Sequence, residues 1–220
     1  MSRNGAYPFA VERCSMVESQ LRQRGICDER LLRAMNTVPR HEFVNQQNWS
    51  EAYADHPIPI PEQQTTSQPY MIAAMIQAAQ IRPEDRVLEI GAGCGYQTAL
   101  LAELASQVFA VERYPSLAAA AQKTLERLGY CNTKIVTGDG SLGLRDAAPF
   151  DAIIVSAAAP RIPQALAEQL APGGRLLVPV GESEQQLLQL VQRHADGTTS
   201  ARTLEGCRFV PLIGEQGFAA

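Results

Sequence analysis

The sequence predicts an α/β fold with a doubly wound, mostly parallel sheet that ends in an antiparallel hairpin and carries an added N-terminal helical layer. From Asp85 onward, short β-rich runs alternate with amphipathic runs of helix length, as in a parallel sheet covered on both faces. Beyond Gly181, two strand-like runs flank Asp196-Gly197, a dipeptide typical of hairpin turns. Two amphipathic runs near the N-terminus indicate the added helices.

The N-terminal third contains the helical layer and a proline-rich connection. Residues 11–25 and 28–38 are predicted helices, the second with Asp28 as its N-cap. The connection that follows, 53–69, contains three closely spaced prolines. Because proline fixes φ and lacks a backbone donor, we expect an extended, polyproline-like path over the surface.

The remainder of the chain supplies the sheet. The predicted strands are 86–91, 107–112, 134–140, 150–158, 173–181, 185–194 and 198–212. The predicted helices between them are 96–105, 115–129 and 160–170. Pro115 and Gly129 mark the start and the end of one of these helices, as expected from their backbone preferences.

Composition argues against several classes of function. The 19 Lys and Arg residues are scattered and outnumbered by 23 Asp and Glu residues, so we expect no nucleic-acid or membrane partner. The five cysteines include no C-x-x-C pair, which predicts ordinary thiols in a reducing compartment and no metal site. No run approaches 18 consecutive apolar residues and no signal peptide is evident. We therefore expect a cytoplasmic protein.

The stretch QQTTSQPY, residues 63–70, is rich in hydroxyls and amides and lies directly before the helix-like run MIAAMIQAA. Local capping is one explanation, because Ser67 suits an N-cap and Pro69 suits a first helical turn. Contact with a ligand is the other explanation. The residues of the sheet bear on this choice.

A glycine-rich loop follows the first predicted strand, in VLEIGAGCGYQ. Gly91, Gly93 and Gly95 allow a sharp turn and a close approach of the backbone to a ligand. Their G-x-G-x-G spacing differs from the G-x-G-x-x-G of dinucleotide-binding proteins. The ligand of this loop therefore need not carry a pyrophosphate.

Two acidic residues follow the next two strands. Glu112 lies at the end of the second strand, 21 residues after Gly91 (112 − 91), where a carboxylate can accept hydrogen bonds from both hydroxyls of a ribose. Asp139, in TGDG, ends the third strand, and its carboxylate could accept a hydrogen bond from the exocyclic amine of an adenine. An adenosyl ligand without a pyrophosphate indicates S-adenosylmethionine and a methyltransferase.

The chain also resembles the protein-L-isoaspartate O-methyltransferase family between about Met16 and Leu212. The resemblance rests on several segments in family order, including MVESQLRQRGICDERLLRAMNTVPRHEFV, PIPEQQTTSQPYMIAAM, DRVLEIGAGCGYQTALLAEL, APFDAIIVSAAAPRIP, LAPGGRLLVPVG and RFVPL. It implies a Rossmann-like class I methyltransferase that uses S-adenosylmethionine and releases S-adenosylhomocysteine. The implied reaction esterifies the free α-carboxylate of L-isoaspartyl residues in damaged proteins and peptides, and so begins their repair through a succinimide; the sequence does not indicate whether D-aspartyl residues also react.

The resemblance also implies specific site residues. Cofactor contacts are implied for Gly91, Gly93, Gly95, Glu112, Asp139 and Gly140. Ser67 is the implied active-site residue, and the substrate is expected to contact Thr65, Thr66, Ser67 and Gln68. Pro61 and Gln63 stand where many members carry glycines, so the resemblance does not determine the conformation of this loop.

We expect a single methyltransferase domain over residues 1–220. Residues 1–80 form its helical and active-loop region, and 81–220 its cofactor-binding sheet and C-terminal strands. Two alternatives stay open: a methyltransferase of the same fold that acts on another small carboxylate or amine, and a non-catalytic adenosyl-binding module. The intact Ser67 segment argues against the second. The sequence does not indicate an oligomeric state.

Overall fold

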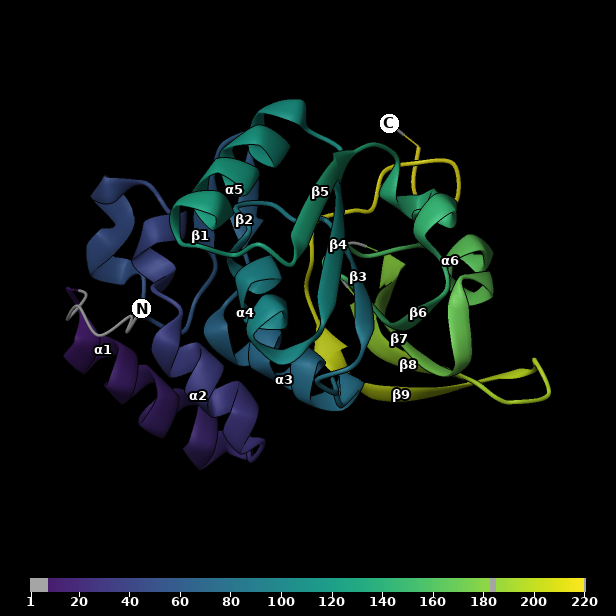
Figure 1. Cartoon of the computed structure of the whole chain (residues 1–220), viewed down its shortest axis with the longest axis horizontal. Helices are drawn as coiled ribbons and strands as arrows, with labels where there is room; N and C mark the ends of the chain where they lie inside the picture. Colours follow the sequence, from purple (N-terminus) through teal and green to yellow (C-terminus); the bar gives the residue numbers. More distant parts are fainter. Residues whose placement is uncertain (1–7, 183–184, 220) are drawn as a thin grey trace.

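A computed structural model of the chain, which describes residues 8–182 and 185–219, confirms the predicted sheet (Figure 1). Seven strands lie in the order β5-β4-β3-β6-β7-β8-β9. The first five of these are parallel, and β8 and β9 are added antiparallel to β7. The strands are β3 (Arg86–Ile90), β4 (Gln107–Glu112), β5 (Thr133–Thr137), β6 (Phe150–Val155), β7 (Leu170–Glu182), β8 (Gln185–Arg193) and β9 (Thr199–Cys207).

Helices cover both faces of the sheet, and further helices form an outer layer on one side (Figure 1). Helices α3, α4 and α5 cover one face, α6 covers the other, and α2 packs on α4 from outside. The α-helices are α1 (Ala10–Ser15), α2 (Glu29–Thr37), α3 (Pro69–Ala79), α4 (Tyr96–Leu104), α5 (Pro115–Arg127) and α6 (Gln164–Glu168). The shorter turns are η2 (Arg22–Arg24), η3 (Arg40–Phe43), η4 (Gln46–Glu51), η5 (Gly140–Leu142) and η6 (Arg145–Ala147).

The central strand β3 divides its side chains between two apolar clusters. Val87 belongs to the cluster beneath α3 and α4, and Leu88 belongs to the cluster on the α6 side. This alternation follows from the two-residue period of a strand. The two clusters therefore pack against opposite faces of β3, the strand whose carboxyl end leads into the glycine-rich loop.

The N-terminal helical layer is present, but its first helix differs from the prediction. Over residues 11–25 the chain passes from α1 into a π-helix, η1 (Met16–Leu21), and then into η2, which ends at Gly25 with φ of 92°. The buried residues Met16, Val17 and Leu21 keep the spacing of an ordinary α-helix, so their pattern did not indicate the π-helical register. The predicted N-cap of α2 is confirmed, since the Asp28 carboxylate accepts hydrogen bonds from the Arg30 and Leu31 amides.

The expected polyproline-like path is wrong. The segment instead forms a hairpin in which β1 (Ile58–Ile60) pairs antiparallel with β2 (Gln64–Thr66). Ile58 and Ile60 are buried beneath this hairpin, and Pro59 is tolerated between them because a two-stranded ribbon has free edges. Glu62 and Gln63 make the turn with φ of 59° and 56°.

Ser67 is not the N-cap of the helix that follows. Helix α3 begins at Pro69, as the first-turn preference of proline predicts. Its N-cap is Gln68, with no side-chain capping bond. The capping explanation of the polar stretch is therefore wrong for Ser67.

Among the helices that the structure describes, none combines the length and apolarity required to span a membrane.

Candidate active site

The glycine-rich loop lies at the carboxyl end of β3, where the order of the parallel strands reverses between β3 and β6. Such switch points are the usual ligand sites of open α/β sheets. Gly91, Gly93 and Gly95 have φ of 86°, 54° and 88°, a region that side chains other than glycine adopt with strain. Two backbone bonds of 2.8 Å fix the loop against its neighbours, from the Gly91 amide to Val111 and from the Ser156 amide to Ile90.

The Glu112 carboxylate lies directly beside this loop, at the end of β4. It accepts hydrogen bonds from the amide of Gly93 at 2.9 Å and from the amide of Tyr114 at 3.0 Å. Its residue is only 5% exposed. A carboxylate has about four lone-pair positions, so each oxygen retains acceptor capacity for a ligand hydroxyl.

Glu112 lines a pocket, here called the inner pocket, whose walls come from the strand ends. Its walls include Ile90, Gly91, Gly93, Val111, Glu112, Tyr114, Gly140 and Ser156, together with 210–213 of the C-terminal segment. Gly140 has a steric reason to be glycine, because a Cβ there would lie 2.5 Å from the Ile90 side chain. The structure thus brings four of the six predicted cofactor residues to one pocket: Gly91, Gly93, Glu112 and Gly140.

The other two predicted cofactor residues do not line the inner pocket. Gly95 precedes α4 and packs against Ala121 of α5, so its lack of a side chain serves helix packing. Asp139 lies just outside, and its carboxylate accepts bonds from the amide and hydroxyl of Ser141 and from the Glu215 amide at 2.8 Å. These bonds hold the pKa of Asp139 below its usual value, against the opposing effect of burial. Its contact with an adenine stays a prediction.

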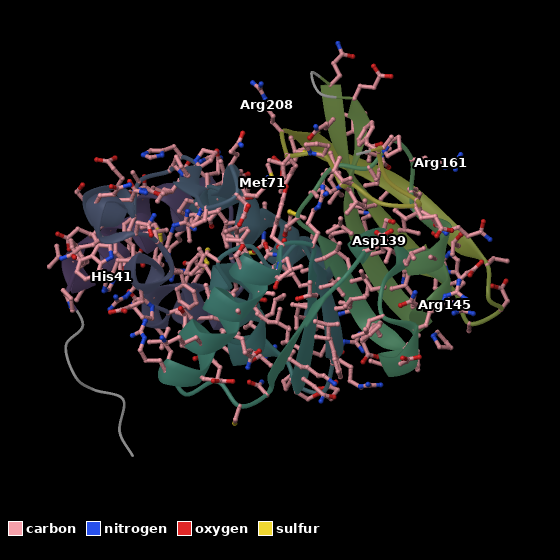
Figure 2. All side chains as sticks on the ribbon, turned by 90° about the horizontal axis from the view of Figure 1, so that it is seen from above. His41, Met71, Asp139, Arg145, Arg161 and Arg208 are labelled. Atoms are coloured by element: carbon pink, nitrogen blue, oxygen red, sulfur yellow. The ribbon has the colours of Figure 1, made fainter. Side chains whose placement is uncertain are left out.

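A second and larger cavity of about 920 Å³, here called the outer groove, adjoins the inner pocket. Thr65, Ser156, Val210, Pro211 and Ile213 line both. The groove is also lined by Pro57, Ser67, Gln68, Met71, Glu182, Gln186, Arg208, Phe209 and Phe218. Figure 2 shows Met71 and Arg208 on the same side of the molecule.

The polar stretch supplies part of the wall of the outer groove. Thr65, Ser67 and Gln68 line it, whereas Thr66 points away and is 7% exposed. The structure therefore brings three of the four predicted substrate residues to the groove. Among the residues that the structure describes, none forms a hydrogen bond with the Ser67 hydroxyl. The backbone carbonyl of Ser67 accepts a hydrogen bond from Arg40 at 2.9 Å. The hydroxyl is free to bind a ligand.

A buried network supports the wall that the two cavities share. The Gln97 side-chain amide donates to the Ser156 hydroxyl at 2.9 Å and to the Glu89 carboxyl at 3.0 Å. Thr98 donates to the other Glu89 oxygen at 2.5 Å. Burial raises the pKa of Glu89 to about 8, against the hydrogen bonds from Thr98 and Gln97, which lower it. Burial thus favours the neutral, protonated form of the Glu89 carboxyl.

Cys94, in the glycine-rich loop, is not an activated nucleophile. Burial raises the pKa of its thiol, although Arg40 and Thr66 lower it. Because the thiolate is the reactive form, this environment favours the inert thiol. The sequence had indicated the same conclusion.

Sequence reasoning missed three parts of the site. Ser156 follows β6 at the switch point, and that position alone could have indicated a ligand contact. The C-terminal residues 208–211 and 213 line the groove, yet their distance along the chain from the glycine-rich loop concealed this. Arg40, which contacts Ser67 from the helical layer, gave no sequence signal.

Comparison with known proteins places this architecture in a family. The sequence profile of protein-L-isoaspartate(D-aspartate) O-methyltransferase matches residues 12–217. A protein-L-isoaspartate O-methyltransferase of Koribacter versatilis (strain Ellin345) is 57% identical over 211 residues, which are 96% of this chain and 95% of the relative. One from Methanoculleus marisnigri (strain ATCC 35101 / DSM 1498 / JR1) is 52% identical over 214 residues, 97% of this chain and 96% of the relative.

Solved structures agree with these relatives. A protein described as a protein-L-isoaspartate O-methyltransferase superimposes with a TM-score of 0.84 at 29% identity, over 93% of this chain and 67% of the other. A Plasmodium falciparum protein of the same description, in complex with S-adenosyl-L-homocysteine, gives a TM-score of 0.80 at 26% identity, over 91% of this chain and 98% of the other. The chain therefore belongs to the protein-L-isoaspartate (D-aspartate) O-methyltransferase family.

Proposed function

We propose that the inner pocket holds S-adenosylmethionine, the outer groove holds a peptide with an L-isoaspartyl residue, and the methyl group passes between them at the Thr65–Gln68 segment. The protein is an enzyme that methylates the free α-carboxylate of isoaspartyl residues in damaged proteins and peptides. The observation that carries this assignment is the wall common to both cavities, which includes Thr65 and Ser156. A methyl donor and an acceptor must meet at such a boundary.

The residues of the inner pocket fit an adenosyl group. Glu112 keeps acceptor capacity on both carboxylate oxygens, which suits the two hydroxyls of a ribose. The apolar side chains of Ile90, Val111 and Ile213 can pack against an adenine. When bound, S-adenosylmethionine supplies an electrophilic methyl group on a positively charged sulfur.

The residues of the outer groove fit a carboxylate that attacks without a general base. A carboxylate is ionised near neutral pH, so the groove must hold it in line and need not deprotonate it. Ser67, Gln68 and Ser156 offer hydroxyl and amide groups for this, which orient the anion without the strong neutralisation of a bidentate arginine. Good orientation can contribute roughly 7 to 11 kcal/mol to a reaction. These individual roles are proposals.

Further parts of the assignment rest on the sequence. We propose a reducing, cytoplasmic location because the five cysteines are odd in number and include no C-x-x-C pair. The expectations of no metal and no nucleic-acid partner stay predictions, as does activity on D-aspartyl residues.

An assay with a matched pair of peptides tests this function. One peptide contains L-isoaspartate and its twin contains normal aspartate at the same position. The isoaspartyl carboxylate is attached to Cα, one methylene nearer the backbone, and a misplacement of about 1 Å can cost on the order of a hundredfold in rate. We therefore expect labelled methyl transfer at least a hundredfold faster to the isoaspartyl peptide.

The product distinguishes this reaction from the alternatives. An isoaspartyl methyl ester should release labelled methanol in mild alkali as the neighbouring amide nitrogen closes a succinimide ring. Equal labelling of both peptides, alkali-stable label, or cofactor binding without transfer would contradict the proposal. Those three outcomes correspond in turn to a methyltransferase of other carboxylates, one of amines, and a non-catalytic binding module.

A further inference from the structure

Arg40 is the largest fully buried side chain in the structure, with 0% exposure. Its Nη2 donates a hydrogen bond to the Ser67 carbonyl at 2.9 Å. Its Nε and Nη1 have no partner among the residues that the structure describes. A buried charge with unmet donors is costly, and such an arrangement in a native protein calls for a reason.

The guanidinium joins three parts of the active site. Arg40 comes from η3, in the outer helical layer. Its hydrogen bond reaches the segment that lines the outer groove, and its guanidinium carbon lies 4.8 Å from the centroid of the Tyr96 ring, in the first residue of α4 after the glycine-rich loop. The outer layer thus contacts both the substrate segment and the element that follows the cofactor loop.

The backbone on either side of the α3 start is held from two directions. Arg40 binds the carbonyl of Ser67, and the Asp55 carboxylate accepts from the Tyr70 amide at 3.2 Å. A carbonyl bond fixes the peptide plane between Ser67 and Gln68, because that plane is rigid. The directions of both of these side chains into the outer groove depend on that plane.

We propose that Arg40 is a positioning residue for methyl transfer, which acts by fixing the Ser67–Gln68 peptide plane at the wall of the outer groove. This inference rests on the proposed function, because it assumes that Ser67 and Gln68 orient the acceptor carboxylate. Turnover depends steeply on such placement. Substrate and cofactor do not need to touch Arg40 for its loss to slow the reaction.

Stability and turnover should respond in different ways if this is correct. Replacing a buried charged group by an apolar side chain of similar length is often neutral or stabilising. A purely structural Arg40 would instead lower stability when it is removed and leave turnover of the folded enzyme unchanged. Arg30 offers a matched control, since it donates to the carbonyls of Ile81 and Leu104, outside both cavities.

The experiment compares Arg40→Met, Arg40→Lys and Arg30→Met with the wild type, all at a temperature where each is folded. Thermal unfolding, cofactor affinity, kcat and KM for the isoaspartyl peptide are measured. We expect Arg40→Met to lower kcat at least fivefold while cofactor affinity changes less than threefold, with Arg40→Lys in between. Arg30→Met should lose stability and keep normal kcat. If Arg40→Met retains kcat within fivefold of the wild type, the proposal is overturned.

Two further comparisons keep the result decisive. If Arg40→Met does not fold, the same fivefold threshold on kcat is applied to Arg40→Lys. The kcat of the double variant Arg40→Met/Ser67→Ala, or of its Lys counterpart, should be at most about twofold below that of the slower single variant, because both changes disturb the placement of the same Ser67–Gln68 segment. If the two fold-reductions in kcat multiply in the double variant, Arg40 does not act through Ser67. Wild-type activity on the isoaspartyl peptide is measured first, since its absence would count against the proposed function and not against the placement of Arg40.

Discussion

At the scale of single residues, the site depends on carboxyl groups in very different surroundings. Glu112 is bound by two loop amides and keeps free acceptor positions toward the inner pocket. Glu89 is buried one residue before the end of β3, and its pKa is raised to about 8. One carboxyl can serve a ligand and the other supports the wall.

Glu112→Gln should weaken binding of S-adenosylmethionine at least tenfold. The variant keeps the size of the side chain but loses the charged acceptor, whose hydrogen bonds are worth about 1.5 to 3 kcal/mol each. Calorimetric titration measures the affinity, and Glu126→Gln, on the exposed side of α5, is the control. An unchanged dissociation constant for Glu112→Gln would remove this residue from the cofactor site.

The Glu89 carboxyl should make the protein less stable as the pH rises. In the unfolded chain a glutamate titrates near about 4.3, whereas burial raises the pKa of Glu89 to about 8 in the fold. Between these values the folded state binds more protons, so the free energy of unfolding falls by up to about 1.4 kcal/mol per pH unit. Below and above this window the two states carry the same charge at Glu89, and its contribution is flat.

Glu89→Gln removes this titration. Urea denaturation at pH 5, 6.5 and 8 should show a smaller loss of stability with rising pH for Glu89→Gln than for the wild type. Because the comparison uses the difference between two proteins, the other ionisable groups cancel. Parallel curves would show that Glu89 keeps an ordinary pKa.

At the scale of elements, the sequence predicted the sheet well and the active-site hairpin poorly. Strands such as β4 were found with their correct ends because a parallel strand buried on both faces is a continuous apolar run. The β1–β2 hairpin was missed because its prolines indicated an extended path, while its actual cause is tertiary: Ile58 and Ile60 are buried. The π-helical register of η1 left no signal in the pattern of side chains.

The turn of this hairpin is strained. Glu62 and Gln63 both have positive φ, which costs a residue other than glycine about 1 to 2 kcal/mol. Gln63→Gly should raise the free energy of unfolding by up to about 1 kcal/mol, after the greater freedom of glycine in the unfolded chain is subtracted. Chemical denaturation measures this, and Gln107→Gly, at an exposed position in β4, should destabilise instead. Destabilisation by both changes would show that the turn tolerates its present residues without strain.

At the scale of the whole molecule, the site forms where the N-terminal third and the last residues of the chain meet the sheet. The glycine-rich loop and Glu112 were predictable because they lie on consecutive strands of one topological unit. Arg208 and Arg40 were not, since each reaches the site only through packing of distant segments, whereas Ser156 was missed although it follows β6 at the switch point. The resemblance supplied Ser67, which the residue pattern alone left undecided between capping and ligand contact.

The charge of the outer groove should bias its choice of peptide. Arg208 and Glu182 are its charged lining residues, and within the described chain Arg208 forms no ion pair. Exposed charge pairs are worth about 0.2 to 1 kcal/mol, so Arg208→Gln should weaken the preference for an acidic over a basic neighbour of isoaspartate by about two- to fivefold in kcat/KM. Arg202→Gln, on β9 and outside the groove, is the control. An unchanged ratio of kcat/KM values would exclude Arg208 from substrate selection.

The wall shared by the inner pocket and the outer groove has a consequence for inhibition. Thr65 and Ser156 border both cavities, so a single molecule could cross from one to the other. A bisubstrate compound that links an adenosyl group to an isoaspartyl analogue would bind its second half as an intramolecular event, at an effective concentration set by a short linker. Its affinity should then far exceed that of either half alone.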